Sequence, residues 1–188
     1  MSKFLNTSTV NSADIISNCD VNSEKLDFAK KVIISLQNEV IKNINSGLGP
    51  FIAAIYDDKG KFVCKCANSV VNDKCSNCHA EVNAIKEAEK IFKTYDLSPF
   101  NLSIYVSAEP CMMCLGAIMW SGIKSVYYSV PSNLVEKITG YDEGFKPNWF
   151  EEFFNRGITV YGNIESKLGC EALEAYVKSG DVIYKPKR

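Results

Sequence analysis

Histidine is almost absent from this chain, since His79 is the only one among 188 residues. Long apolar runs are absent as well, because no stretch approaches the roughly 18 apolar residues that a membrane-spanning helix needs. Residues 1–8 also lack the apolar segment of a secretory signal. We therefore expect a cytoplasmic protein that has no membrane partner.

The sequence has no excess of one charge sign. Its 21 Lys and Arg residues nearly balance 22 Asp and Glu residues, which gives a formal net charge of −1 at pH 7. Proteins that grip phosphate backbones usually carry a broad basic field. Here only the final Lys185-Pro186-Lys187-Arg188 is rich in basic residues. We expect a small-molecule substrate and no nucleic-acid partner.

Polar residues dominate the start of the chain, and a helical pattern begins at Ser23. Residues 1–22 are rich in Ser, Asn, Thr and Asp without periodicity, which predicts a loosely ordered lead-in. Residues 23–188 have the length of one domain, and the 46% hydrophobic content of the chain is enough for a full core.

Helix and strand patterns alternate along this domain. Apolar residues recur at helical spacing in residues 23–44, 79–95, 111–121 and 167–177. Short apolar runs predict strands at residues 51–56, 61–67, 102–107, 125–129 and about 159–161, with one short helix between the last two. This alternation favours a three-layer α/β domain.

Two segments carry the chemistry: His79-Ala80-Glu81 and Pro110-Cys111-Met112-Met113-Cys114, each at the start of a predicted helix. A Cys-x-x-Cys pair on a first helical turn directs both sulfurs toward one point, and a histidine can supply a third zinc ligand. The fourth tetrahedral position then stays open for water, as in catalytic sites. We predict that His79, Cys111 and Cys114 bind Zn²⁺ and that Glu81 carries the proton.

The eight cysteines allow other readings. Cys75-Ser76-Asn77-Cys78-His79 has the form of a c-type haem attachment site, but the chain shows no export signal and no second histidine. A structural zinc site made of Cys75, Cys78, Cys111 and Cys114 would leave Glu81 without a role. We expect Cys75 and Cys78 to be a reduced thiol pair beside the site. The remaining cysteines are expected to be packing residues: Cys19, Cys64, Cys66 and Cys170.

The order His-x-Glu, then Pro-Cys-x-x-Cys, resembles the cytidine deaminase superfamily, and within it the guanine, tRNA adenosine and fungal-type cytosine deaminases. The resemblance covers about residues 26–130. It implies an α/β/α sandwich with a central five-stranded mixed sheet, and a homodimer or larger assembly. It places the zinc ligands and the catalytic glutamate on the residues named above. It also places a base-holding asparagine on Asn68, for which a strand-end turn residue is the alternative.

Three segments are similar to guanine deaminases in particular: Gly49-Pro50-Phe51, the segment from Cys114 to a matching Trp120, and Gly140-Tyr141-Asp142-Glu143. The resemblance implies that Phe51 and Trp120 line the pocket of a flat ring and that Asp142 relays protons to the leaving group. The alternatives are a core aromatic at Trp120 and a surface turn residue at Asp142.

The resemblance weakens at two places. Ile52 stands where a glycine is expected, and beyond about residue 145 the chain is closer to the closing strand and helix of the cytosine and tRNA enzymes. We expect this C-terminal part to form a lid or closing element over the site.

These features predict zinc-dependent hydrolytic deamination of a free nucleobase, with guanine converted to xanthine and ammonia. The alternatives left open are deamination of cytosine, an aminotriazine or guanosine, and, less favoured, of adenosine in tRNA. A zinc-stabilised module without turnover is a different class, and it would lose its fold rather than an activity when the metal is removed.

Overall fold

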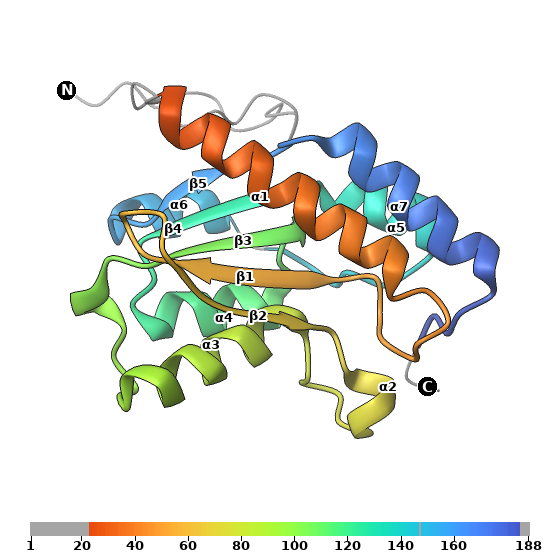
Figure 1. Cartoon of the computed structure of the whole chain (residues 1–188), viewed down its shortest axis with the longest axis horizontal. Coiled ribbons are helices and arrows are strands. Elements are labelled where there is room, and N and C mark those ends of the chain that lie inside the picture. Colours follow the sequence, from red (N-terminus) through yellow and green to blue (C-terminus); the bar gives the residue numbers. More distant parts are fainter. Residues whose placement is uncertain (1–22, 147, 185–188) are drawn as a thin grey trace.

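A five-stranded sheet forms the middle layer of the molecule, with its strands in the order β2-β1-β3-β4-β5 (Figure 1). β1 is antiparallel to both β2 and β3, whereas β3, β4 and β5 run parallel. The predicted mixed sheet is therefore confirmed. Its strands are β1 (Ile52–Tyr56), β2 (Phe62–Ala67), β3 (Ser103–Ala108), β4 (Ser125–Val130) and β5 (Thr159–Tyr161).

The computed structural model describes residues 23–146 and 148–184. The predicted lead-in at residues 1–22, the packing role of Cys19 and the basic cluster at residues 185–188 lie outside this part of the chain. No helix within it is long and apolar enough to cross a membrane.

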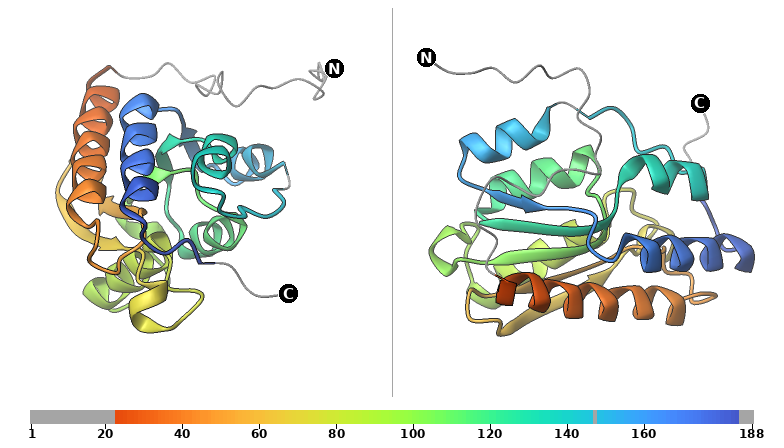
Figure 2. Two further views of the ribbon diagram at one scale, coloured as in Figure 1. Left: turned by 90° about the vertical axis from the view of Figure 1, so that its right-hand side faces the viewer. Right: turned by 90° about the horizontal axis from the view of Figure 1, so that it is seen from above.

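Two helical layers cover the two faces of the sheet, which confirms the three-layer prediction (Figure 2, left). α1 (Ser23–Lys42) and α7 (Ser166–Ser179) lie side by side on one face. α3 (Ala80–Phe92), α4 (Met112–Ser121) and α6 (Trp149–Asn155) cover the other. Each face has its own apolar core, and the parallel strands lie between them. Five of the six residues in β3 and in β4 are therefore buried.

The β1–β2 hairpin is built by its turn residues as expected. Asp57 Oδ1 accepts hydrogen bonds from the backbone N–H groups of Lys59 (3.0 Å) and Lys61 (2.8 Å). Gly60 has a φ of 77°, a left-handed conformation that glycine adopts without steric cost. The turn thus fixes the pairing of the two strands.

The short helices were less predictable than the long ones. The structure has two between β4 and β5, α5 (Ser132–Thr139) and α6, where the sequence predicted one. α6 has seven residues and packs through Trp149 and Phe153, so tertiary contacts rather than periodicity define it. Two further short helices are α2 (Val70–Asp73) and the 3₁₀ turn η2 (Ser98–Phe100).

The carboxyl ends of β3 and β4 lie next to the N-termini of two helices, α4 and α5. β3 ends at Ala108 and α4 begins at Met112, while β4 ends at Val130 and α5 begins at Ser132. These short connections place two helix N-termini at the carboxyl ends of adjacent parallel strands, the usual position of a ligand site in α/β sheets.

Candidate active site and metal centre

His79, Cys111 and Cys114 converge at the N-termini of α3 and α4. His79 directly precedes α3 and Cys111 directly precedes α4, and both have an extended backbone. Cys114 adds its sulfur from the first turn of α4. Nδ1 of His79 lies 3.5 Å from Sγ of Cys111 and 3.6 Å from Sγ of Cys114, and the two sulfurs are 3.7 Å apart.

These separations fit a tetrahedral zinc ion. With Zn–S bonds of about 2.3 Å and a Zn–N bond of about 2.0–2.1 Å, tetrahedral angles put two sulfurs about 3.8 Å apart and a sulfur and a nitrogen about 3.6 Å apart. The observed distances agree with both values within about 0.1 Å. Two cysteine sulfurs and an imidazole are also a donor set that zinc prefers. The residues present therefore fit the metal.

The thiols of Cys111 and Cys114 differ in acidity. The hydrogen bond with Cys114, reinforced by His79, lowers the pKa of Cys111 to about 4. The pKa of Cys114 is raised well above its usual value by the same hydrogen bond and by burial. Burial lowers the pKa of His79, but the hydrogen bond and charge of Cys111 outweigh it, and the net direction is upward. One sulfur is thus already the metal-binding thiolate at neutral pH.

Glu81 lies buried beside this group, with 5% of its surface exposed. Burial, together with the charge of the neighbouring Cys111, raises the pKa of Glu81 to about 7. A carboxyl group with a pKa near neutrality can take up and return a proton in one reaction cycle. The sequence analysis predicted Glu81 as the proton carrier, and the structure places its buried carboxyl group beside the three predicted metal ligands.

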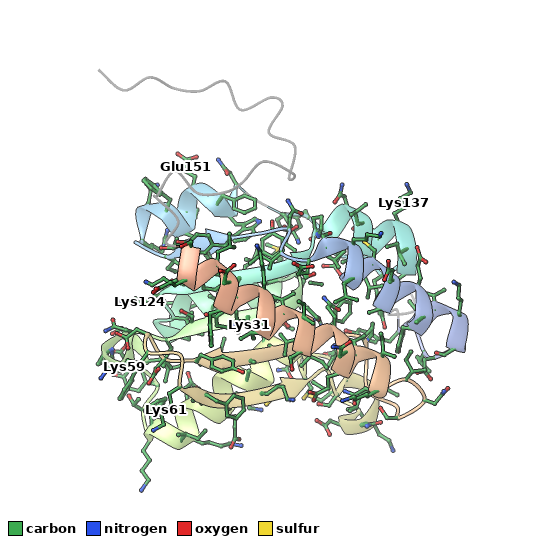
Figure 3. The ribbon with its side chains drawn as sticks, turned by 45° about the horizontal axis from the view of Figure 1, so that its top comes forward. Lys31, Lys59, Lys61, Lys124, Lys137 and Glu151 are labelled. Atoms are coloured by element: carbon green, nitrogen blue, oxygen red, sulfur yellow. The ribbon has the colours of Figure 1, made fainter. Side chains whose placement is uncertain are left out.

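The metal centre opens into a cavity of about 870 Å³. Its apolar lining includes Phe51, Met112, Met113, Tyr141 and Tyr184, and its polar lining includes four carboxylates. No lysine or arginine is among the described lining residues. The exposed charged side chains labelled in Figure 3 project elsewhere, from α1, the β1–β2 turn, the segment before β4, α5 and α6. The carboxylates that line the cavity are Glu81, Glu109, Asp142 and Glu143.

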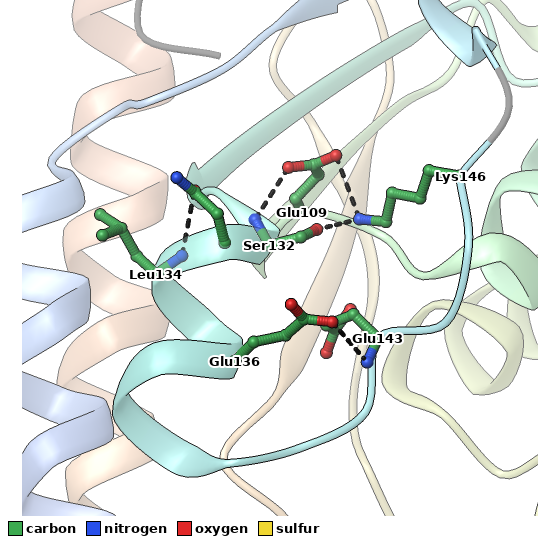
Figure 4. A network of polar contacts seen from close by, with 7 residues as sticks. Glu109, Ser132, Leu134, Glu136, Glu143 and Lys146 are labelled. Atoms are coloured by element: carbon green, nitrogen blue, oxygen red, sulfur yellow. Dashed lines mark hydrogen bonds and ion pairs between the residues drawn. The ribbon is translucent and has the colours of Figure 1, made fainter. Parts of the chain in front are cut away.

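The cover loop, which we define as residues 140–146, lies over this cavity and supplies Tyr141 and Glu143 to its lining. Tyr141 packs against Phe51, with ring centroids 5.4 Å apart. The backbone N–H of Glu143 donates to Glu136 Oε1 at 3.1 Å (Figure 4). Burial raises the pKa of Glu143 to about 7; Lys146 opposes this, whereas Cys111 and Glu81 reinforce it.

Tyr184 reaches the site from the C-terminal segment. Its hydroxyl lies 3.1 Å from Nε2 of His79 and accepts a hydrogen bond from Nδ2 of Asn68 at 3.2 Å. When Nδ1 of His79 binds a metal, Nε2 carries the proton and donates it to this hydroxyl oxygen. The hydroxyl hydrogen of Tyr184 then remains available to the cavity, which Tyr184 lines.

The structure brings together most of the predicted site residues. Phe51 and Asp142 line the cavity with His79, Glu81 and Cys111. The side chain of Asp142 is exposed at the rim, and its Oδ1 accepts the backbone N–H of Gly144 at 2.9 Å. The side chain of Glu143 is less exposed than that of Asp142 and interacts electrostatically with Cys111 and Glu81.

Two predicted substrate contacts do not line the cavity. Asn68 is 1% exposed and lies behind Tyr184. Trp120 is 82% exposed near the far end of α4. Trp120 comes nine positions after Cys111, which corresponds to about 13 Å along a helix axis, so the two residues lie at opposite ends of α4.

Three residues that line the cavity were not singled out by the sequence analysis: Tyr141, Glu143 and Tyr184. Glu143 was adjacent to the chosen Asp142, and only the loop conformation distinguishes the two carboxylates. Tyr184 had no local signal, because it is 105 residues from His79 in sequence.

The thiol pair Cys75 and Cys78 is separate from the metal ligands. Cys75 Sγ donates to Asn77 Oδ1 at 2.9 Å, and Cys78 is buried. Within residues 23–146 and 148–184, the only group of three or more His, Cys, Asp or Glu donors within 4.8 Å of one another is His79, Cys111 and Cys114. This geometry does not support the alternative four-cysteine zinc site.

Comparison with known sequences points to the same chemistry. The family model of the cytidine and deoxycytidylate deaminase zinc-binding region matches residues 29–130. The guanine deaminase of Bacillus subtilis (strain 168) is 37% identical over 105 residues, which cover 55% of this chain and 65% of that protein. A tRNA-specific adenosine deaminase of Buchnera aphidicola is 44% identical over 61 residues, 32% of this chain and 39% of that protein. The matches thus span less than two thirds of either relative.

Solved structures extend the likeness to most of the chain. A structure in complex with 2,6-diaminopurine matches with a TM-score of 0.78 at 36% identity, over 84% of this chain and 85% of that one. The guanine deaminase of Nitrosomonas europaea matches with a TM-score of 0.75 at 36% identity, over 78% and 83%. Since the family model covers more than half of the sequence and includes His79, Glu81, Cys111 and Cys114, the chain belongs to the cytidine and deoxycytidylate deaminase family of zinc-binding proteins.

Proposed function

We propose that this protein is a zinc-dependent hydrolase that deaminates the free base guanine to xanthine and ammonia. The observation that carries the proposal is the position of Glu81, a buried carboxyl group with a pKa near 7 beside a donor set with zinc geometry. The reaction needs a proton carrier at this place, since one proton must pass from water to the ring and another must reach the leaving amine.

The lining of the cavity favours a neutral base over a nucleotide. Glu109 is engaged by Lys146 and Ser132, but the other three carboxylates of the lining can accept hydrogen bonds, and guanine offers N–H donors at its ring and its exocyclic amine. No lysine or arginine lines the cavity within residues 23–146 and 148–184, and these cationic side chains are the usual partners of a phosphate group. The solved structures bound to 2,6-diaminopurine and 8-azaguanine support a purine with an amino group.

Different side chains of the cavity carry out different steps of the proposed reaction. When bound, zinc supplies the Lewis acidity that lowers the pKa of a water molecule to about 7. Glu81 would take one proton from the attacking water and deliver it to N3 of guanine, while the water oxygen bonds to C2, the carbon that bears the amino group. Glu143 would give a proton to the amino nitrogen as the C2–N bond breaks and ammonia leaves, and it would recover a proton from the new hydroxyl group, which becomes the carbonyl of xanthine. Phe51 and Tyr141 exclude bulk water and hold the flat ring.

This mechanism assigns the relay in the cover loop to Glu143 rather than to Asp142. Burial, reinforced by the nearby Cys111 and Glu81, raises the pKa of Glu143 to about 7, so this carboxyl group can take up and give away a proton close to neutral pH. Asp142 is instead proposed to shape the loop through its hydrogen bond from Gly144. Asn68 is proposed to reach the base when Tyr184 shifts or through the Tyr184 hydroxyl.

Trp120 is better explained by a second copy of the chain. Met112, Met113 and Trp120 leave apolar surface exposed along α4 (38%, 40% and 82%), although a helix that is apolar on all sides is normally buried. We propose that α4 packs against its counterpart in a homodimer. Light scattering should show a dimer for the wild type and a monomer for Trp120→Glu. Ile41→Glu, on the opposite face of the sheet, should stay dimeric; an unchanged mass for Trp120→Glu would refute this interface.

Two further expectations belong to the same proposal. Residues 23–188 are proposed to act as one deaminase domain whose last part closes the site, as Tyr184 exemplifies.

The described cysteines are all free thiols, which suits the reducing cytoplasm. A fluorescent fusion found in another compartment would contradict that location.

The test is ammonia release from separate incubations of the zinc-loaded protein with guanine, cytosine, adenine and guanosine, with Glu81→Gln as control. Release from guanine, with xanthine as the product, is expected. Turnover of cytosine or guanosine alone would keep the zinc chemistry and refute guanine as substrate. Silence on all four bases and nucleosides from a protein that unfolds on zinc removal would favour a structural zinc module.

A further inference from the structure

The cover loop is tied to the ligand-bearing loop by a buried ion pair. Nζ of Lys146 lies 3.0 Å from Oε1 of Glu109, and the two side chains are 15% and 6% exposed. Lys146 also donates to Oγ of Ser132, while Oε2 of Glu109 accepts the backbone N–H of Ser132 at 2.9 Å (Figure 4). Both oxygens of the carboxylate are thus occupied, and three segments meet at one point.

The positions of these residues in the chain show that the ion pair connects the metal-ligand segment to the cover loop. Glu109 comes two residues before Cys111, and Ser132 is the first residue of α5. Lys146 comes three residues after Glu143 at the end of the cover loop. The other end of the loop is held by Tyr141, which is 6% exposed and packs between Phe51 and Tyr184. Glu143 therefore lies between two fixed points above the metal centre.

Stability alone does not explain the ion pair. Removing two charges from water is unfavourable, and apolar residues of similar size are often as stabilising as a buried ion pair. An ion pair with both carboxylate oxygens engaged does, however, permit few arrangements of the loop that carries it. The pair is well suited to fixing where Glu143 points.

We propose that Lys146 is a positioning residue of the reaction, whose ion pair with Glu109 holds the cover loop closed and aims Glu143 at the leaving amino group. The effect on turnover rests on the proposed function, whereas the effect on the loop does not. Lys146 does not line the cavity and acts through the loop.

The test compares Lys146→Met with Lys137→Met. Lys137 is exposed on α5 and has no ion pair among residues 23–146 and 148–184. Lys146→Met should lower kcat for guanine about 10-fold, since small displacements of catalytic groups cost 10- to 100-fold in rate, with KM changed less and zinc content unchanged. Hydrogen exchange at residues 140–146 should become faster. Lys137→Met should match the wild type in all of these measurements.

Lys146→Arg sharpens the result, because it keeps the charge and should recover kcat to within about 3-fold of the wild type. If Lys146→Met does not fold, the double variant Glu109→Gln/Lys146→Met removes both charges and leaves no unpaired buried ion. It should fold and show fast exchange in the cover loop.

Two results would overturn the proposal: wild-type kcat and exchange in the folded variants, or lost turnover with an unchanged loop, which would indicate that Lys146 acts directly on the substrate. A wild type that does not turn over guanine would refute the proposed function alone, and the exchange measurement would still decide the role of Lys146.

Discussion

The floor and the cover of the cavity are built in different ways. The floor consists of His79, Glu81, Cys111 and Cys114, supplied by two short motifs at the starts of α3 and α4. The cover consists of the cover loop and Tyr184, which reach the cavity from distant parts of the sequence. The comparison indicates that the two parts have different roles. The local motifs determine the chemistry, whereas the contacts between distant parts of the chain determine which substrate enters the cavity and how the leaving group departs.

The floor is held by the backbone of the fold. His79 and Cys111 accept the first main-chain hydrogen bonds of their helices, from Asn83 at 2.9 Å and Leu115 at 2.9 Å. The cover is held by side chains, through aromatic contacts of Tyr141 and the ion pair of Lys146. Substitutions in the floor should therefore lower kcat the most. Substitutions in the cover should have smaller effects, each on a different property: kcat, KM or stability.

Glu81→Gln tests the floor and carries the largest expected effect. Removing the proton carrier should lower kcat about 10³-fold, within the range for general acid–base groups, while zinc stays bound because Glu81 is not a ligand. The measurements are ammonia release and metal content by mass spectrometry. Retained turnover, or loss of zinc, would break the assignment of this residue to proton transfer.

Glu143→Gln tests whether the cover also carries chemistry. We expect kcat to fall about 10²-fold, because the amide cannot donate the proton that the departing amine needs. Asp142→Asn is the matched control in the next position, and since an asparagine can keep the hydrogen bond from Gly144, it should stay within about 2-fold of the wild type. The opposite ranking of the two variants in steady-state kinetics would return the relay to Asp142.

Tyr184→Phe separates binding from chemistry within the cover. The hydroxyl bridges Asn68 and His79, and one hydrogen bond contributes about 0.5–1.5 kcal/mol, or about 2- to 10-fold in affinity. KM for guanine should rise by this factor with kcat little changed. If kcat falls instead and KM does not move, Tyr184 belongs with the groups that act in the transition state.

The difference between floor and cover also explains which parts of the structure could be predicted from the sequence. The long helices, the five strands and their three-layer arrangement followed from periodicity, and the zinc donors followed from the spacing of Cys111 and Cys114 after His79. These features are local, or repeat along the chain. The family resemblance also placed Phe51 at the cavity.

The cover was not predictable in the same way. Choosing between Asp142 and Glu143 requires the direction of each side chain in an irregular loop, and adjacent residues give no periodic signal. The role of Tyr184 depends on where the chain passes after α7, and the pairing of Lys146 with Glu109 joins residues 37 positions apart. Trp120 was assigned from a motif, but the length of α4 separates it from the metal ligands.

The pH dependence of stability is an effect on the fold rather than on turnover, and it concerns the ionisation of Glu143 in the cover. Burial raises its pKa from 4.5 to about 7, so the folded protein binds this proton more tightly than the unfolded chain does. The stabilisation is complete below about pH 4.5 and is lost as the pH rises to about 7. Glu143→Gln cannot ionise, and should therefore exceed the wild type in Tm by about 7–14 °C at pH 8 and match it near pH 4. Thermal unfolding of chelator-treated protein is the measurement, since a bound cation would favour the ionised carboxylate, and Lys137→Met should show no such pH-dependent difference. A constant offset between pH 4 and 8 would mean that Glu143 ionises normally, and that the cover holds no proton to give.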